Sequence, residues 1–362
     1  MVADLRLLDT GSYPTKPLPA LGTAGTYSRG AVVEAQRMAN YVVGPWEVDT
    51  ALEAKHSVGV LLIDGTDKLT LIGPAELASV SQRHNFINGF LSARQARNGD
   101  RSLLNAVLRF GDAPSAAAVV SELGRTELAG PPNSAAVQRV SIPGHPEAVS
   151  SSYSLIDPQS RRERVAVRSF VLRGQYVLTQ LAESVGGRDA AARLVANAIN
   201  LQAIVIDQFP AIDPADFAEI ALDPTGLLAR TLPLAPGEAT LEQNARFGKR
   251  GALHFQSDPI RSSALFDRTI MDGLVRAKTN VYRSSDGVAA LGMVDQFAAE
   301  AAETAGKPAD GAKFIRTSRC MQLTTGFYCL ASKDRYVIEA YSQSLDDAHQ
   351  QVAAQYILLV GY

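Results

Sequence analysis

A segment of strand and helix character occurs twice in this chain of 362 residues. Gln175 begins the sequence QYVLTQLAES, and Arg335 begins the sequence RYVIEAYSQS. Each is followed by an Asp and then by small and aliphatic residues at helical spacing. A strand and a helix repeated in the same order predict that the chain folds as two similar lobes that arose by internal duplication.

Four pairs of matched positions follow the same order in the two halves of the chain. We expect the last of these pairs, FINGFL and IMDGLV, to be helical in both lobes. The pairs are Tyr176 with Tyr336, Asp189 with Asp347, Asn105 with Asn280, and Phe86–Leu91 with Ile270–Val275.

The expected order within a lobe is helix, strand, helix, several antiparallel strands and a closing helix. This order is typical of an α+β fold with an antiparallel sheet and helices packed on one face. Five prolines between residues 209 and 238 exclude a long regular element there and indicate a linker. The predicted organisation is an extended lead segment at 1–30, a first lobe at 31–208, a Pro-rich linker at 209–245 and a second lobe at 246–362.

Composition excludes several classes of function. The chain has 35 Lys and Arg against 37 Asp and Glu, a net charge of −2, which favours neither nucleic acid nor an anionic membrane surface as a partner. The sequence contains no apolar window of about 18 residues. No export signal follows Met1, so either the protein is cytosolic or a signal precedes the sequence given.

The two cysteines help to choose between these compartments. Thr324 and Thr325 suit a two-residue turn between two β-prone runs, and such a turn places Cys320 opposite Cys329. Their Cα atoms would then lie about 4.5 Å apart, within reach of a disulfide. A bulge at Gly326 would shift this register, and two buried free thiols are the alternative. We expect a disulfide, and therefore an oxidising compartment outside the cytoplasm.

The sequence carries none of the motifs of common catalytic or metal sites. The five histidines have no further His or Cys at a ligand spacing, and there is no Gly-x-Ser-x-Gly motif. We therefore expect no catalytic residue, no metal site and no cofactor, and a protein that is not an enzyme.

Aromatic residues near the expected sheets are the candidates for a ligand surface. Aromatic side chains with few charges suit an apolar or carbohydrate ligand, although strand aromatics usually pack in the core. The candidates are Trp46, Tyr153, Tyr176, Tyr336 and Tyr341.

Three segments carry a resemblance to a known family. They are LDTGSYPTKP at 8–17, GAVVEAQRMANYVVGPWEVD at 30–49 and LDPTGLLARTLP at 222–233. Together they resemble actinobacterial exported lipoproteins of mycobacteria, Nocardia and Rhodococcus, a family of unknown function. The resemblance implies a signal peptide and a lipobox cysteine upstream of this sequence, and a lipid anchor on the outer face of the plasma membrane. Each lobe also resembles, more loosely, the extracytoplasmic sensor domains of mycobacterial Ser/Thr kinases.

These observations favour a non-enzymatic cell-envelope lipoprotein. It would bind an apolar or glycolipid ligand, or an envelope protein, between its two lobes. The alternative is a structural or accessory subunit of a membrane-associated envelope complex.

Overall fold

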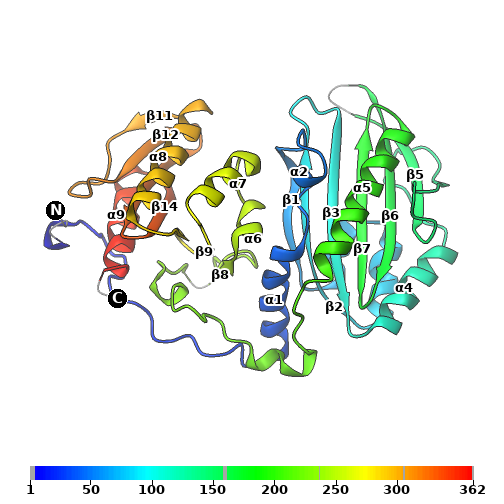
Figure 1. Cartoon of the computed structure of the whole chain (residues 1–362), viewed down its shortest axis with the longest axis horizontal. Helices are drawn as coiled ribbons and strands as arrows, with labels where there is room; N and C mark the ends of the chain where they lie inside the picture. Colours follow the sequence, from blue (N-terminus) through cyan, green and yellow to red (C-terminus); the bar gives the residue numbers. More distant parts are fainter. Residues whose placement is uncertain (1–4, 158–160, 236, 305, 361–362) are drawn as a thin grey trace. The chain divides into compact units, whose positions relative to one another are not determined.

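The computed structural model describes residues 5–157, 161–235, 237–304 and 306–360 (Figure 1). The chain folds into two compact units, the first made of residues 24–220 and 253–260 and the second of residues 1–23, 221–252 and 261–362. Residues 209–245, for which we predicted a linker, are thus shared between the units, with the division at residue 220. Residues 1–4 of the predicted lead segment and residues 361–362 of the predicted second lobe lie outside the described residues.

The first unit is built on a seven-stranded antiparallel sheet with the order β1-β2-β3-β7-β6-β5-β4. Its strands are β1 (Ala54–Ile63), β2 (Phe86–Gln95), β3 (Arg101–Phe110), β4 (Gln138–Arg139), β5 (Val149–Ile156), β6 (Glu163–Arg173) and β7 (Tyr176–Ser184). Its helices are α1 (Tyr27–Met38), η2 (Ala39–Tyr41), α2 (Pro45–Val48), η3 (Thr66–Leu71), α3 (Ala75–Arg83), α4 (Ala113–Arg125), α5 (Arg188–Ile206) and η4 (Pro214–Glu219).

The second unit has its own seven-stranded antiparallel sheet, with the order β8-β9-β10-β14-β13-β12-β11. Its strands are β8 (Ala245–Phe247), β9 (Gly273–Arg276), β10 (Asn280–Arg283), β11 (Lys307–Ala309), β12 (Arg319–Leu323), β13 (Gly326–Lys333) and β14 (Tyr336–Ser342). Its helices are η1 (Leu5–Leu7), η5 (Leu228–Arg230), α6 (Lys249–Leu253), α7 (Pro259–Arg268), α8 (Gly287–Glu303) and α9 (Leu345–Leu358).

The two sheets have the same topology. Each strand of the first unit has a counterpart at the same place in the second, from β1 with β8 to β4 with β11. Helices α4 and α8 follow the third strand of their sheets, and α5 and α9 follow the seventh. The α+β fold of two similar lobes, predicted from the repeated segment, is therefore confirmed.

The strand register refines the matched positions. Tyr176 pairs with Arg109, and Tyr336 pairs with Arg283. If the tyrosines are equivalent, Asn280 corresponds to Ala106, so the predicted match of Asn280 with Asn105 is displaced by one residue.

The helix predicted at Phe86–Leu91 was wrong, because these residues belong to strand β2. Ile87 to Arg94 are all buried, so both faces of this strand are covered. A strand covered on both faces lacks the apolar and polar alternation that identifies a strand in sequence. The helix predicted at Ile270–Val275 was wrong at its end for the same reason, because strand β9 covers Gly273–Arg276.

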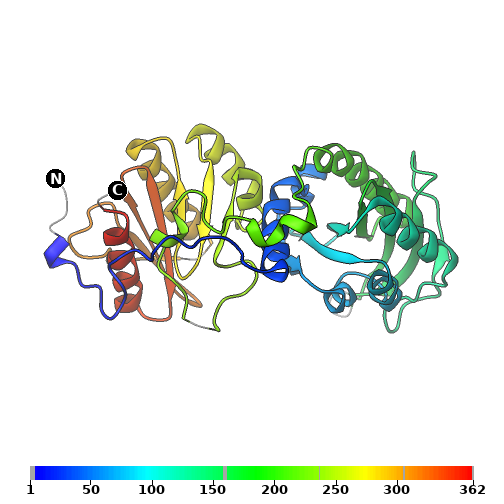
Figure 2. The ribbon, with the colours of Figure 1, turned by 90° about the horizontal axis from the view of Figure 1, so that it is seen from below.

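Helices cover both faces of the first sheet rather than one (Figure 1 and Figure 2). Leu104 and Ala106 of β3 join the same core cluster as Val119 of α4. Asn105 lies between them on the strand, so it points to the other face, where its amide donates to Gln202 of α5. We expected no apolar window of about 18 residues, but α5 contains one that by length and composition could span a membrane. Half of this window is buried inside the structure.

A buried glutamine of the closing helix holds the end of a short 3-10 helix, η2 or η5, in each unit. In the first unit the Gln202 side chain accepts from Val43 N–H at 2.9 Å and donates to the Tyr41 carbonyl at 2.8 Å. In the second unit Gln355 accepts from Leu232 N–H at 2.7 Å and donates to the Arg230 carbonyl at 2.8 Å. The same clamp therefore recurs in both copies, at positions that the repeated segments did not reveal.

The second unit contains the expected disulfide. Leu323 pairs with Gly326 and Cys320 pairs with Cys329, which is the register that a Thr324–Thr325 turn predicted. Cys320 and Cys329 are bonded, with Cα atoms 4.1 Å apart, and both are buried in the core beneath α9.

Replacing both cysteines by alanine should destabilise the second unit by about 2–3 kcal/mol, because the cross-link restricts the unfolded chain. Thermal unfolding followed by far-UV circular dichroism measures this, with oxidised wild type as the reference. An unchanged melting temperature in the Cys320→Ala/Cys329→Ala variant would show that the bridge does not stabilise the unit.

The segment before α1 packs on the second unit. Leu8 belongs to the core cluster of that unit, and Leu18 N–H donates to the Ala229 carbonyl at 2.8 Å. The Tyr13 hydroxyl donates to Asp347 on α9 at 2.8 Å. Burial, and then the hydrogen bond to Asp347, raise the pKa of Tyr13 to about 12.

This raised pKa predicts a stability change at high pH. The folded chain holds the Tyr13 proton more tightly than the unfolded chain, whose tyrosines titrate near pH 10. The contribution of Tyr13 to stability is therefore complete below pH 10 and is lost as pH rises through about 12. The difference in unfolding free energy between wild type and Tyr13→Phe should shrink over this range. A difference that stays constant with pH would contradict the shift.

Candidate ligand-binding site

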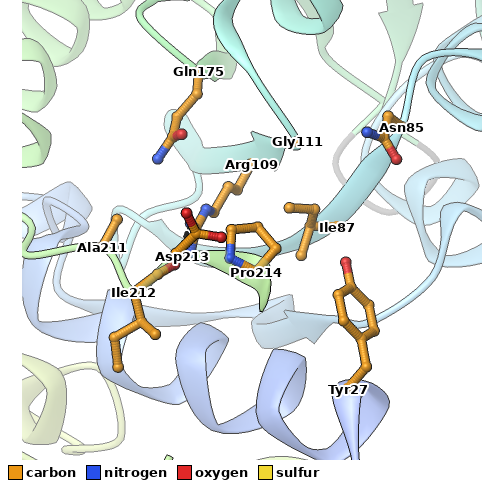
Figure 3. Close-up of a pocket in the computed structure, with 10 residues that line it drawn as sticks. All are labelled: Tyr27, Asn85, Ile87, Arg109, Gly111, Gln175, Ala211, Ile212, Asp213 and Pro214. Carbon is orange, nitrogen blue, oxygen red and sulfur yellow. Dashed lines mark hydrogen bonds between the residues drawn. The ribbon is translucent and has the colours of Figure 1, made fainter. Parts of the chain in front are cut away.

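A pocket of about 480 Å³ lies in the first unit, where β3 ends and β7 begins (Figure 3). Its volume is within the range of small-molecule sites, roughly 300–1,000 Å³. Contributions come from α1, from the start of β2, from the turns at the ends of β3 and β7, and from the segment that follows α5. The lining residues are Tyr27, Asn85, Ile87, Arg109, Gly111, Gln175, Ala211, Ile212, Asp213 and Pro214.

Arg109, one of the lining residues, belongs to a buried ion pair. Arg109 of β3 and Glu34 of α1 are joined at 2.8 Å, and their side chains are 2% and 0% exposed. The Arg109 guanidinium also lies 5.3 Å from the ring centre of Phe217. Glu34 forms a second ion pair with Arg37, whose side chain reaches solvent. Charges are rarely buried unless they are paired, so Arg109 and Glu34 depend on each other for their burial.

The ion pair holds one wall of the pocket in place. Arg109 donates to the Ile212 carbonyl at 2.6 Å, and Ile212 N–H donates to Glu34 at 2.8 Å. Both backbone groups of Ile212 are thus bound to the same pair. Arg37 adds a hydrogen bond to the Pro210 carbonyl at 3.1 Å. The segment at 210–214 therefore depends on side chains of α1 and β3 for its position.

One donor of Arg109 is left without a partner in the described part of the chain. The Nε atom is buried and makes no hydrogen bond to any of the described residues. Arg164 and Arg168 also have a buried Nε atom of this kind, and the Nε atom of Arg109 has almost no accessible surface. It is therefore not open to a ligand in the pocket, which Arg109 lines with its other atoms.

Polar side chains from three other elements surround the space. Figure 3 shows the Tyr27 hydroxyl, the Gln175 amide and the Asp213 carboxylate directed towards the middle of the pocket. One Asp213 oxygen accepts from Ala215 N–H at 2.9 Å and caps η4. The Tyr27 ring packs on Phe217 with ring centres 5.3 Å apart. The lining thus combines hydrogen-bonding groups with one aromatic ring.

The second unit uses the equivalent arginine differently. Phe110 N–H donates to the Gln175 carbonyl, and Ser284 N–H donates in the same way to Arg335. Arg283, one residue before Ser284, therefore corresponds to Arg109. Arg283 forms a two-point ion pair with Asp272, at 2.7 and 2.9 Å, and its side chain is 28% exposed. Hydrogen bonding to Asp272 raises the pKa of Arg283.

Two of the predicted ligand residues are buried elsewhere in the first unit. Trp46 is 4% exposed and packs against Arg94 and His254. Tyr153 is 6% exposed and lies beneath the Arg168 guanidinium. Burial raises the pKa of Tyr153. Neither residue lines the pocket.

The other three predicted residues lie on β7 and β14. Tyr176 adjoins the pocket, because its hydroxyl accepts from Gln175 at 3.1 Å, and burial raises its pKa. Tyr336 is half-buried beneath Arg230, and Tyr341 is 43% exposed and bonds to the Thr325 carbonyl. A ligand role for these aromatic residues stays a prediction.

Sequence reasoning missed the residues that build the pocket. Tyr27 falls within the predicted lead segment, where no function was expected. Glu34 and Arg37 lie one helical turn apart in the second half of α1, after the apolar run Ala31–Val33, and this was the available signal. Arg109, near the end of a strand whose other residues are mostly apolar, was a second signal.

Cys320, Cys329 and His349 are close enough together to suggest a metal site. The two sulfurs are bonded to each other, and His349 Nε2 lies 2.7 Å from the Asp310 carbonyl. These atoms are therefore engaged in bonds within the second unit.

Comparisons with known proteins give a family but no activity. No curated protein matches the chain. Among solved structures, the extracellular domain of PknH from Mycobacterium tuberculosis is similar with a TM-score of 0.31 and 14% identity, over 46% of this chain and 95% of that domain. Two family models match, the N-terminal domain of unknown function DUF7373 at residues 21–222 and its C-terminal counterpart at 227–361. The chain therefore belongs to the DUF7373 family.

Proposed function

We propose that this protein is a non-enzymatic binding protein of the cell envelope, and that its first unit holds a small ligand in the pocket above Arg109. The observation that carries the proposal is the buried Arg109–Glu34 pair, which fixes the pocket wall at Ile212. A buried ion pair contributes little net stability compared with apolar residues of the same size. Its presence here is better explained by the pocket that it shapes.

The contrast between the two units supports this assignment. Arg283 stands at the position of Arg109 but forms a partly exposed ion pair with Asp272. In the first unit Ile87, at the start of β2, lines the pocket, whereas in the second unit Asp272, just before β9, pairs with Arg283. Duplicated copies that retain an arginine but bury it in one unit alone have diverged at this site.

The Cys320–Cys329 disulfide supports a location outside the cytoplasm, since such bonds persist in oxidising compartments. The resemblance to exported lipoproteins adds a lipid anchor on the outer face of the plasma membrane to the proposal. The inter-lobe ligand surface and the accessory-subunit alternative stay predictions.

A thermal-shift screen with sugars, amino acids, nucleosides and fatty acids tests ligand binding by this pocket. At least one class should raise the melting temperature of wild type, because a ligand that binds only the folded state stabilises it. The effect should disappear in Ala211→Trp, which places an indole in the pocket. Equal shifts in both proteins, or no shift with any class, would contradict the proposal.

A further inference from the structure

We infer that the ligand is a neutral polyhydroxylated compound, a mono- or disaccharide. The inference rests on the proposed function and specifies the chemistry of the same pocket. It follows from the charge of the lining, from its hydrogen-bonding groups and from its one aromatic face.

The charges in the pocket do not favour an anion. Arg109 and Asp213 are the charged residues of the lining, and the Arg109 charge is already matched by Glu34 at 2.8 Å. Asp213 adds a carboxylate that lies at the exposed side of the pocket. A phosphate or carboxylate ligand would meet this negative charge beside one lining cation, Arg109, which shares Glu34 with Arg37. Arg37 does not line the pocket. A neutral ligand avoids the conflict.

The hydrogen-bonding groups suit hydroxyls. Each hydroxyl both donates and accepts, and the pocket offers amides at Asn85 and Gln175 that do both. Asp213 supplies an acceptor, and the Tyr27 hydroxyl can both donate and accept. Several hydroxyls on one small ring would satisfy donors and acceptors that come from different elements. A ligand with a single polar group would leave most of them without partners.

The apolar part of the lining suits the C–H face of a sugar ring. Tyr27 is 51% exposed, and its ring packs against the ring of Phe217. Ile87 and Pro214 contribute further apolar surface to the lining. Aromatic side chains offer a rigid apolar face with a polar end, which is the pattern that an amphipathic sugar ring requires. An acyl chain would cover the apolar part but would bury the polar groups without partners.

Binding should be measured on the full chain by saturation-transfer NMR and isothermal titration calorimetry. The probes are an array of neutral mono- and disaccharides that includes glucose, galactose, mannose and maltose, with inorganic phosphate and dodecanoate as contrasts. At least one neutral sugar should bind, and phosphate and dodecanoate should not. Tyr27→Ala and Asp213→Asn should each weaken sugar binding at least about tenfold, equivalent to about 1.4 kcal/mol.

Phe314→Ala is the matched control, because it removes an exposed aromatic side chain of the second unit. Sugar affinity should be unchanged in this variant. Sugar binding that resists both Tyr27→Ala and Asp213→Asn, or an array without any binding sugar, would overturn the inference. Binding of dodecanoate or phosphate that Ala211→Trp abolishes would also overturn it, while leaving the proposed function in place.

Discussion

Glu34→Leu is expected to lower the free energy of unfolding of the first unit by about 3–5 kcal/mol, because it leaves a buried charge without its partner. The Arg109 guanidinium would lose its buried counter-charge in a site where its side chain is 2% exposed. The substitution also removes the acceptor of Ile212 N–H. The pocket wall would therefore lose its attachment to α1.

Trp46 makes this measurement specific to the first unit. It is the single Trp of the chain and lies buried in that unit, so its fluorescence follows unfolding there in urea. Asp207→Leu is the control. Asp207 forms an ion pair with Arg173, and their side chains are 48% and 47% exposed. Ion pairs as exposed as this one contribute about 0–1 kcal/mol to stability. Equal losses in the two variants would show that the Glu34–Arg109 pair has no special role.

Gln202→Leu is expected to have the second-largest effect, a loss of about 3 kcal/mol or more. The variant leaves the Val43 N–H and the Tyr41 carbonyl without their side-chain partner, and it removes one of the two hydrogen bonds that Asn105 Nδ2 donates. Each buried polar group that loses its hydrogen bond costs about 1–3 kcal/mol. Urea unfolding followed through Trp46 fluorescence measures the loss.

Gln208→Leu provides the control for this variant. Gln208 is exposed and makes one long hydrogen bond, at 3.4 Å, to the Ile204 carbonyl. Its replacement should change stability by less than about 0.5 kcal/mol. If both variants unfold at the same urea concentration, the Gln202 clamp is not a stabilising feature of the unit.

The fold was predictable where the sequence repeats itself. The similarity of the segments at Gln175 and Arg335 indicated two lobes, and strands β7 and β14 begin one residue after these positions. The cysteine register was predictable because a hairpin pairs residues close in sequence. β2 was not, because its residues are buried on both faces and carry no alternation.

The pocket was much less predictable. Its essential contacts join Glu34, Arg109 and Ile212, which are separated by 75 and 103 residues along the chain. No local pattern links such positions, and only the folded sheet brings the end of β3 beneath α1. The aromatic residues chosen from the sequence were selected by composition, and of these Tyr176 alone adjoins the pocket.

The most direct test of ligand binding by the first unit is amide chemical-shift mapping of the full ¹⁵N-labelled protein during titration with a neutral sugar that binds. We predict that the largest shifts occur at Tyr27, Asn85, Gly111, Gln175 and the segment at 211–213, which line the pocket. Saturable shifts that lie elsewhere, with these amides unchanged, would contradict ligand binding in this pocket.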